Sequence, residues 1–97
     1  MADGEVIYKT YTMTATAAAL SAAALLGTTM IPRRIIVQNA AAAADSLYLG
    51  GSAVSAAAAG REVAAGGEFV FENQDPSAIY IIGTINAANI AYLIAEF

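Results

Sequence analysis

Histidine and cysteine, the side chains that most often carry proton transfer, nucleophilic attack and soft-metal binding, are both absent from this 97-residue chain. Chemistry would therefore depend on carboxylates, on Lys9, on tyrosines or on serines. Glu68 and Glu72 are the closest approach to a pair of acids, but they sit four residues apart in E-F-V-F-E. Strand alternation places both on one solvated face, whereas a glycosidase pair needs one of its carboxyls in an apolar pocket.

Metal binding and serine chemistry find no stronger support in the sequence. Asp45, Glu62 and Asp75 fall at predicted turns, where oxygen ligands can gather around calcium, but the D-x-[DN]-x-[DN]-G loop is absent. No S-x-x-K motif offers a lysine to activate a serine. The sequence therefore predicts that the protein is not an enzyme and that it holds no metal or cofactor.

The charge balance bears on the partners. The net charge is -4 and Arg33 and Arg34 form the only basic cluster, whereas nucleic-acid binding needs many cations to displace counterions from phosphates. The alanine-rich run at residues 15–26 is shorter than the roughly 20 residues that cross a bilayer. Neither nucleic acid nor a membrane is expected as a partner.

Short segments rich in β-branched and aromatic residues, separated by Gly, Asn, Asp and Pro, indicate an all-β fold, a small β-sandwich or a jelly-roll-like barrel. In the turn at residues 73–77, Pro76 fixes its own φ and Asp75 can bond nearby backbone. The alanine runs at residues 39–45 and 56–59 are predicted to be loops or single helical turns. Strands are predicted at residues 5–14, 33–38, 46–50, 62–63, 68–72, 78–83 and 89–96.

The first third of the chain leaves two interpretations open. Residues 1–14 are predicted to form a strand or an extended arm, and residues 15–97 a single sandwich domain. Thr16 could cap one short alanine-rich helix that Gly27 would close in the left-handed conformation, with Leu20 and Ala24 on one face. The alternative makes Leu20 an inward-facing strand residue.

The last twenty residues, A-I-Y-I-I-G-T-I-N-A-A-N-I-A-Y-L-I-A-E-F, scarcely alternate between apolar and polar. Taken as a hairpin, they place Ile79, Ile81 and Leu93 in the core. The opposite face is apolar too, which predicts a subunit interface there. An internally sealed sandwich, closed by the N-terminal segment, is the alternative. The predicted interface residues are Tyr80, Ile82, Ile90 and Tyr92.

Several segments carry a resemblance to a known family. R-R-I-I-V-Q-N (residues 33–39), S-L-Y-L-G-G-S (46–52), G-R-E-V-A-A-G-G-E-F (60–69) and the closing I-Y-I-I-G and A-Y-L-I-A-E-F resemble small tailed-bacteriophage head accessory proteins, the capsid cement or decoration proteins. The resemblance covers about residues 12–97, and the chain departs from it in its alanine runs. It implies a β-sandwich or jelly-roll-like fold, a homotrimer, the major capsid protein as partner, and no catalytic site.

On this resemblance we expect a structural virion protein that is made in the host cytoplasm and binds the outside of the capsid. The N-terminal segment is expected to reach a neighbouring subunit, with capsid contacts at Val6, Ile7, Tyr8 and Tyr11, because an apolar chain end can add a strand to an exposed edge. Two alternatives stay open. One is a tail or baseplate accessory protein, and the other is a carbohydrate-binding head-fibre module that would use Tyr48 or Tyr80.

Overall fold

The computed structural model describes residues 4–40, 45–55, 60–84 and 90–97. These residues form eight β-strands and one 3₁₀ turn, η1, at Pro76–Ala78. Sequences such as V-I-Y-K-T-Y-T and R-I-I-V-Q-N favour strands because branched and aromatic side chains pack well on a pleated surface. The strands are β1 (Val6–Thr12), β2 (Ala18–Ala19), β3 (Arg34–Asn39), β4 (Leu47–Gly50), β5 (Arg61–Val63), β6 (Glu68–Glu72), β7 (Tyr80–Ile82) and β8 (Ile90–Glu96).

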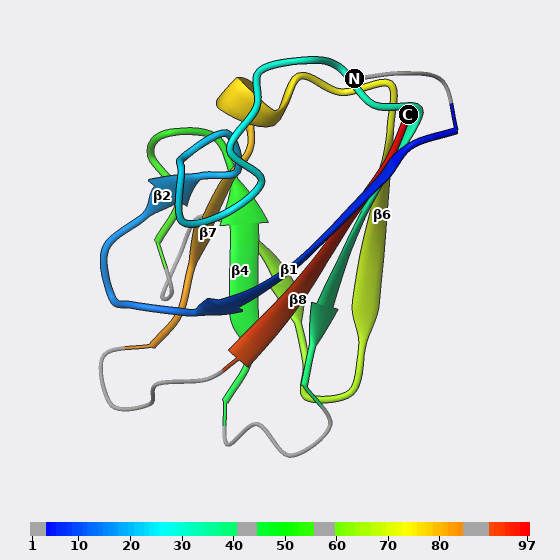
Figure 1. Cartoon of the computed structure of the whole chain (residues 1–97). Helices are drawn as coiled ribbons and strands as arrows, with labels where there is room; N and C mark the ends of the chain where they lie inside the picture. Colours follow the sequence, from blue (N-terminus) through cyan, green and yellow to red (C-terminus); the bar gives the residue numbers. More distant parts are fainter. Residues whose placement is uncertain (1–3, 41–44, 56–59, 85–89) are drawn as a thin grey trace.

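The strand order is that of a jelly roll. Sheet A has the order β1-β8-β3-β6 and sheet B the order β2-β7-β4-β5, with every neighbouring pair antiparallel. The pairs β4·β5, β3·β6, β2·β7 and β1·β8 describe one long hairpin that is rolled up, so that β3 also meets β8 and β4 also meets β7. Figure 1 shows the two sheets as separate layers, with β1 and β8 crossing in front. The all-β prediction is confirmed.

The core lies between the two sheets and is thin. On β3, Ile35 and Val37 point inward, and on β8 the inward positions are Ala91, Leu93 and Ala95. Sheet B supplies Leu47, Leu49, Val63 and Ile81, and the segment after β2 supplies Leu20, Leu25 and Leu26. Phe69 and Phe71 of β6 pack against this cluster while Glu68, Val70 and Glu72 face solvent, as the alternation of E-F-V-F-E predicts.

Asn39 ties the two sheets together at one end of the sandwich. It is 2% exposed, and its Nδ2 donates to the carbonyl oxygens of Val63 at 3.0 Å and Asp45 at 2.9 Å. Since Asn39 ends β3 and Val63 ends β5, one amide joins sheet A to sheet B. A polar group buried this deeply costs stability unless it is bonded, and these two contacts satisfy the amide nitrogen, whereas the buried Oδ1 has no hydrogen-bond partner within the described residues.

Of the two interpretations left open for residues 16–27, the short helix is wrong. The segment holds the two residues of β2 and then a series of tight turns, closed by bonds such as the Leu26 N–H to the Leu20 carbonyl. Leu20 is fully buried and Ala24 is exposed, so the two do not share a face. Alanine's helix preference is a weak constraint, and pairing with β7 together with burial of Leu20 outweighs it. Gly27 does adopt the positive φ expected of it, +70°.

The C-terminal hairpin is also wrong, although its strands exist. β7 pairs with β2 and β4 in sheet B, while β8 pairs with β1 and β3 in sheet A. The two strands therefore lie in different layers, and residues 85–89 between them lie outside the described residues. The inward assignment of Ile79, Ile81 and Leu93 is confirmed, because all three are buried in the core.

The N-terminal segment is a strand of the chain's own sheet. All seven residues of β1 have partners on β8, from Val6 opposite Glu96 to Thr12 opposite Ile90. Ile7 and Tyr11 pack against the core from this strand. The alanine runs predicted as loops fall almost entirely at residues 41–44 and 56–59, outside the described part of the chain. No helix within the described residues is long and apolar enough to cross a membrane.

Candidate interaction surface

The outer face of sheet A carries an apolar row that crosses all four strands. In the strand register, Tyr8 of β1 lies opposite Ile94 of β8, Ile94 opposite Ile36 of β3, and Ile36 opposite Val70 of β6. Residues that are paired in this way share one face of the sheet. We call Tyr8, Ile94, Ile36 and Val70 the apolar row. Tyr8 is 64% exposed and Val70 39% exposed, so the row faces solvent.

On β8 the larger side chains lie outside. The inward positions Ala91, Leu93 and Ala95 are each 0% exposed, and two of the three are alanines. The outward positions hold Ile90, Tyr92 and Ile94, of which Ile90 is 39% exposed. A central strand that faced only water would place polar residues at these positions. The outer face of β8 is therefore a candidate interaction surface.

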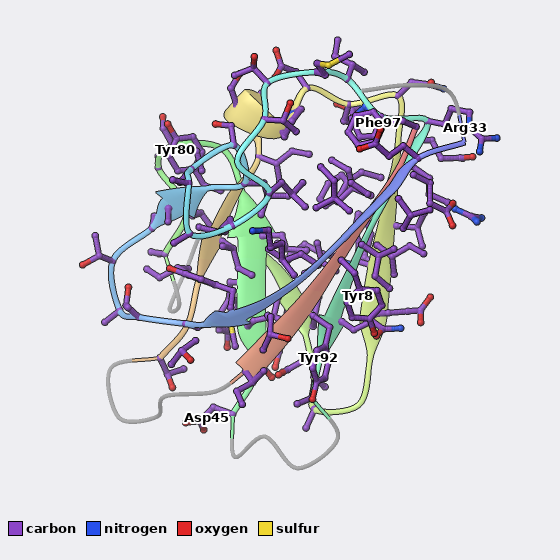
Figure 2. The ribbon with its side chains drawn as sticks, viewed as in Figure 1. Tyr8, Arg33, Asp45, Tyr80, Tyr92 and Phe97 are labelled. Carbon is purple, nitrogen blue, oxygen red and sulfur yellow. The ribbon has the colours of Figure 1, made fainter. Side chains whose placement is uncertain are left out.

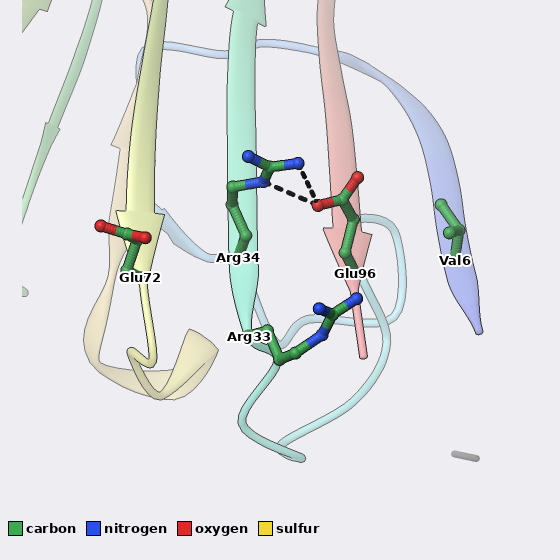
Figure 3. Close-up of a pocket in the computed structure, with 5 residues that line it drawn as sticks. All are labelled: Val6, Arg33, Arg34, Glu72 and Glu96. Carbon is green, nitrogen blue, oxygen red and sulfur yellow. Dashed lines mark hydrogen bonds and ion pairs between the residues drawn. The ribbon is translucent and has the colours of Figure 1, made fainter. Parts of the chain in front are cut away.

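A charged row flanks the apolar row on one side. Its members in register are Val6, Glu96, Arg34 and Glu72, one from each strand of sheet A. Arg34 donates from Nε to Glu96 Oε1 at 2.7 Å and forms an ion pair from Nη2 to the same oxygen at 2.6 Å. Figure 3 shows Arg34 lying between the two carboxylates and bonded only to that of Glu96. We call these four residues the charged row.

A hollow of about 320 Å³ lies at the charged row, lined by Val6, Arg33, Arg34, Glu72 and Glu96 (Figure 3). Arg33 turns away from Arg34 and donates from Nε to the carbonyl oxygen of Phe97 at 3.3 Å. The two guanidinium groups and the two carboxylates balance in charge. The hollow therefore favours neither an anion nor a cation, and we assign it no ligand.

A second polar row flanks the apolar row on the other side. It consists of Thr10, Tyr92, Gln38 and Glu68 in register. Gln38 Nε2 donates to Glu68 Oε1 at 3.2 Å. We call these four residues the polar row. The outer face of sheet A is thus an apolar centre between two polar margins, which is the general plan of a protein interface.

The outer face of sheet B has a different composition. Tyr80 lies opposite Ala19 on one side and Gly50 on the other, and Ile82 lies opposite Tyr48, which in turn faces Glu62. Small residues therefore flank the tyrosine ring of β7, and Ile82 is 9% exposed. No apolar row crosses the described strands of this sheet. The outer face of sheet B is therefore a weaker candidate for a protein contact than the outer face of sheet A.

A cleft of about 300 Å³ opens between the sheets, next to β6. It is lined mainly by Leu49, Arg61, Phe69, Phe71 and Ile79. The Arg61 guanidinium lies 4.7 Å from the centre of the Phe69 ring, and the two phenylalanine rings meet edge to face at 4.9 Å. A cation placed over a ring in this way covers apolar surface that would otherwise meet water. Arg61 therefore partly closes the open side of the sandwich.

The structure separates the four predicted interface residues into two pairs. Ile90 and Tyr92 lie on the outer face of sheet A, whereas Tyr80 and Ile82 lie on β7 in sheet B. Figure 2 shows Tyr80 on the opposite side of the molecule from Tyr92 and Tyr8. A single seam formed by all four residues does not exist in the monomer. The interface role of each pair stays a prediction.

The four predicted capsid contacts are divided by strand alternation. Val6 and Tyr8 lie on the outer face of sheet A and are 53% and 64% exposed. Ile7 and Tyr11 point the other way and pack against the core. Only the first two are available to a partner without unfolding the strand. Ile36, Val70 and Arg34 belong to the same outer face and were missed, although the lone valine between two glutamates in E-F-V-F-E was a usable signal.

The described residues bring together no group of three or more acidic side chains that could hold a metal ion. Glu68 and Glu72 lie on the outer face of β6, and Asp45 accepts from the Thr84 hydroxyl at 2.8 Å. Asp75 caps η1, and the bonds that its carboxylate accepts, first from the Ser77 N–H and then from the Ser77 hydroxyl, lower its pKa. These roles are structural.

The fold and this surface define a small jelly-roll domain with one apolar sheet face. No family model, curated protein or solved structure matches the chain.

Proposed function

We propose that the protein is a structural component of a tailed-phage virion that binds the outside of the capsid and stabilises it. The observation that carries the proposal is the outward placement of Ile90, Tyr92 and Ile94 on a central strand whose inner face is mostly alanine. Such a surface gains stability by being covered, at roughly 25 cal/mol for each Å² of apolar area removed from water.

Three further observations support an assembly role. The sequence resembles phage cement and decoration proteins over about residues 12–97. The jelly roll is a fold shared by viral capsid and lectin domains, although a shared fold alone does not establish function. The chain is small and carries little charge, 12% of its residues.

The mechanism is additive binding at repeated sites. One subunit that spans the seam between two capsid proteins adds only a modest buried area. Repetition over a closed shell multiplies that contribution, because a shell held at many points at once opens only when many contacts fail together. In this proposal, which takes both from the resemblance, the partner is the major capsid protein and the location is the virion surface.

Within this proposal, the capsid contact lies at the β1 margin of sheet A. Val6 and Tyr8 are the most exposed apolar residues of this margin. They stand on an edge strand, where a neighbouring protein can approach without disturbing the core. Lys9 lies on the same strand at a position that faces the inner side of the sheet, and its side chain is exposed. A charged residue at such a position on an edge strand discourages another strand from pairing with that edge. The contact is thus expected to involve side chains rather than strand addition.

The proposal is tested by deleting the gene from the phage that encodes it and imaging the particles by cryo-electron microscopy. We expect the heads to lose density on their outer surface and to rupture at a lower temperature. Adding back the purified protein should restore both. Heads of unchanged appearance and stability would overturn the proposal, and density lost from the tail or baseplate instead would place the protein there.

A pair of matched variants locates the contact in the same assay. Tyr8→Ser removes an exposed ring from sheet A, and Tyr48→Ser removes a ring from the outer face of sheet B. We expect Tyr8→Ser to bind deleted heads more weakly and Tyr48→Ser to bind them as well as the unmodified chain. Loss of binding only with Tyr48→Ser would instead place the capsid contact on the outer face of sheet B.

A further inference from the structure

We infer that the outer face of sheet A binds the same face of a second copy of this chain, around a two-fold axis that runs parallel to the strands between β8 and β3. The inference rests on the assembly role proposed above, and it names the partner that covers the centre of the face. It follows from the strand order β1-β8-β3-β6 and from the three rows defined above.

A two-fold axis in this position brings each row onto its own counterpart. The rotation exchanges β8 with β3 of the second copy, and β1 with β6, while each row keeps its height along the strands. Contacts of this kind are isologous, so each one occurs twice. The apolar row then meets the apolar row, with Ile94 against Ile36 at the centre.

The β8 and β3 positions of the two flanking rows are complementary under the same rotation. In the charged row, Glu96 of one copy faces Arg34 of the other, and this pairing is repeated on the far side of the axis. In the polar row, Tyr92 faces Gln38, so that a phenol hydroxyl meets an amide. The six positions on β8 and β3, three on each strand, therefore place an apolar pair between an ionic pair and a hydrogen-bonding pair. Complementary charge of this kind fixes the register and excludes other arrangements.

The other two-fold arrangement is less favourable. An axis in the plane of the sheet but perpendicular to the strands brings the charged row onto the polar row. Glu72 of one copy then faces Glu68 of the other, and Arg34 faces an uncharged glutamine. Like charges across an interface oppose binding. The charge pattern thus selects the axis parallel to the strands.

The size of the face indicates a weak dimer. Four strands spaced about 4.8 Å apart and three rows spaced about 6.8 Å apart cover roughly 400 Å² on each copy. Two such faces bury about 800 Å², below the roughly 1,200 Å² at which stable interfaces begin. The dimer should therefore dissociate on dilution. Sheet twist separates the edge strands, which leaves Val6 and Tyr8 of β1 free to meet a capsid subunit.

The test uses two charge reversals that are complementary to each other. Arg34→Glu makes the central ionic pairs of a homodimer wholly acidic, and Glu96→Arg makes them wholly basic. Each variant alone should raise the dissociation constant at least tenfold, as measured by sedimentation equilibrium of the full-length chain. In an equal mixture, each of these pairs again joins one acidic and one basic side chain, because one variant supplies only acids at positions 34 and 96 and the other supplies only bases. The mixture should therefore dimerise about as well as the unmodified chain.

The mixture separates the inference from a folding defect. Within one copy, residues 34 and 96 of each variant repel each other to the same extent whether the variant is alone or mixed. Recovery of dimerisation in the mixture is therefore explained only by a contact between two copies. Far-ultraviolet circular dichroism of each variant checks the fold. Should either variant unfold, Ile94→Thr replaces it, because threonine keeps a β-branched side chain on β8 and removes apolar contact. Ile94→Thr should weaken the dimer severalfold. Tyr48→Thr on sheet B is the control that should leave the dimer unaffected.

Three results would overturn the inference. These are a mixture that stays monomeric, an unmodified chain that stays at 9.8 kDa up to millimolar concentration, and a trimeric mass, because a trimer has no two-fold axis. All three leave the particle-imaging experiment unaffected. Failure of the dimer is thus distinguishable from failure of the proposed virion role.

Discussion

β6 and β8 belong to the same sheet, yet they divide their large side chains between its two faces in opposite ways. On β6, two phenylalanines face the core, while two glutamates and the smaller Val70 face solvent. On β8, two alanines and a leucine face the core while two isoleucines and a tyrosine face outward. β6 is an edge strand that follows the rule for a sheet with one wet face. β8 is a central strand and departs from this rule. Burial within one copy of the chain therefore does not account for the large apolar side chains on its outer face.

Removing residues 1–12 deletes β1 and should have the largest effect on this comparison. The deletion exposes one edge of β8 and takes Ile7 and Tyr11 away from the core. We expect the free energy of unfolding to fall by more than about 3 kcal/mol, a large part of the 5–15 kcal/mol that is usual for a domain. Urea unfolding measures the loss. A truncated chain as stable as the whole would show that the segment is a detachable arm.

Adjacent alanine substitutions on β8 separate its two faces. Leu93→Ala leaves a cavity in the core and should lower the free energy of unfolding by about 2–5 kcal/mol. Ile94→Ala removes a side chain from the outer face and should cost less than about 1 kcal/mol under conditions where the chain is monomeric. Equal losses from the two substitutions would mean that the outer face of β8 is sealed within the monomer.

Asn39→Ala tests the connection between the sheets. It leaves the carbonyls of Val63 and Asp45 without the donor that Nδ2 supplies, so stability should fall by about 1–3 kcal/mol. The outer face of sheet A should be unaffected, because the Asn39 side chain points inward. Thermal unfolding measures the first effect and sedimentation the second. A change in self-association with no loss of stability would contradict the assignment.

Acid should weaken the cap of η1, and this is the smallest effect. The bonds that Asp75 accepts lower its pKa below the ordinary value of 3.8, so the folded state favours the charged carboxylate. The stabilisation is therefore fully present above about pH 4 and is lost as pH falls through the lowered pKa. Asp75→Asn should show less of this acid dependence in its unfolding midpoint than the unmodified chain. Identical acid profiles would exclude the contribution.

The pattern of short strands was sufficient to predict the all-β class and most strand positions. Residues 68–72 were placed as they occur in β6, and the predicted strand at residues 33–38 differs from β3 by one residue at each end. Alternation also predicted which residues of β7 and β8 face inward. These are local properties, because side-chain direction along a strand follows from its period of two.

The partners of each strand could not be predicted, because most strands that pair in a jelly roll lie far apart in the sequence. Adjacent strands in sequence usually pair, and so β7 and β8 were expected to form a hairpin. Their apolar character on both faces instead suits two separate sheets. The alignment of Tyr8, Ile36 and Val70 with Ile94 likewise depends on three cross-strand registers that no single segment encodes.

The most direct test of the assembly face is a dilution series followed by nuclear magnetic resonance of isoleucine methyl groups. The chain provides matched reporters, because Ile35 and Ile36 are adjacent on β3 and point to opposite faces, and Ile82 lies on the outer face of sheet B. We predict that the methyl signals of Ile36 and Ile94 shift with concentration while those of Ile35 and Ile82 stay fixed. Shifts at Ile82 alone, or no shift at any isoleucine up to millimolar concentration, would contradict the account.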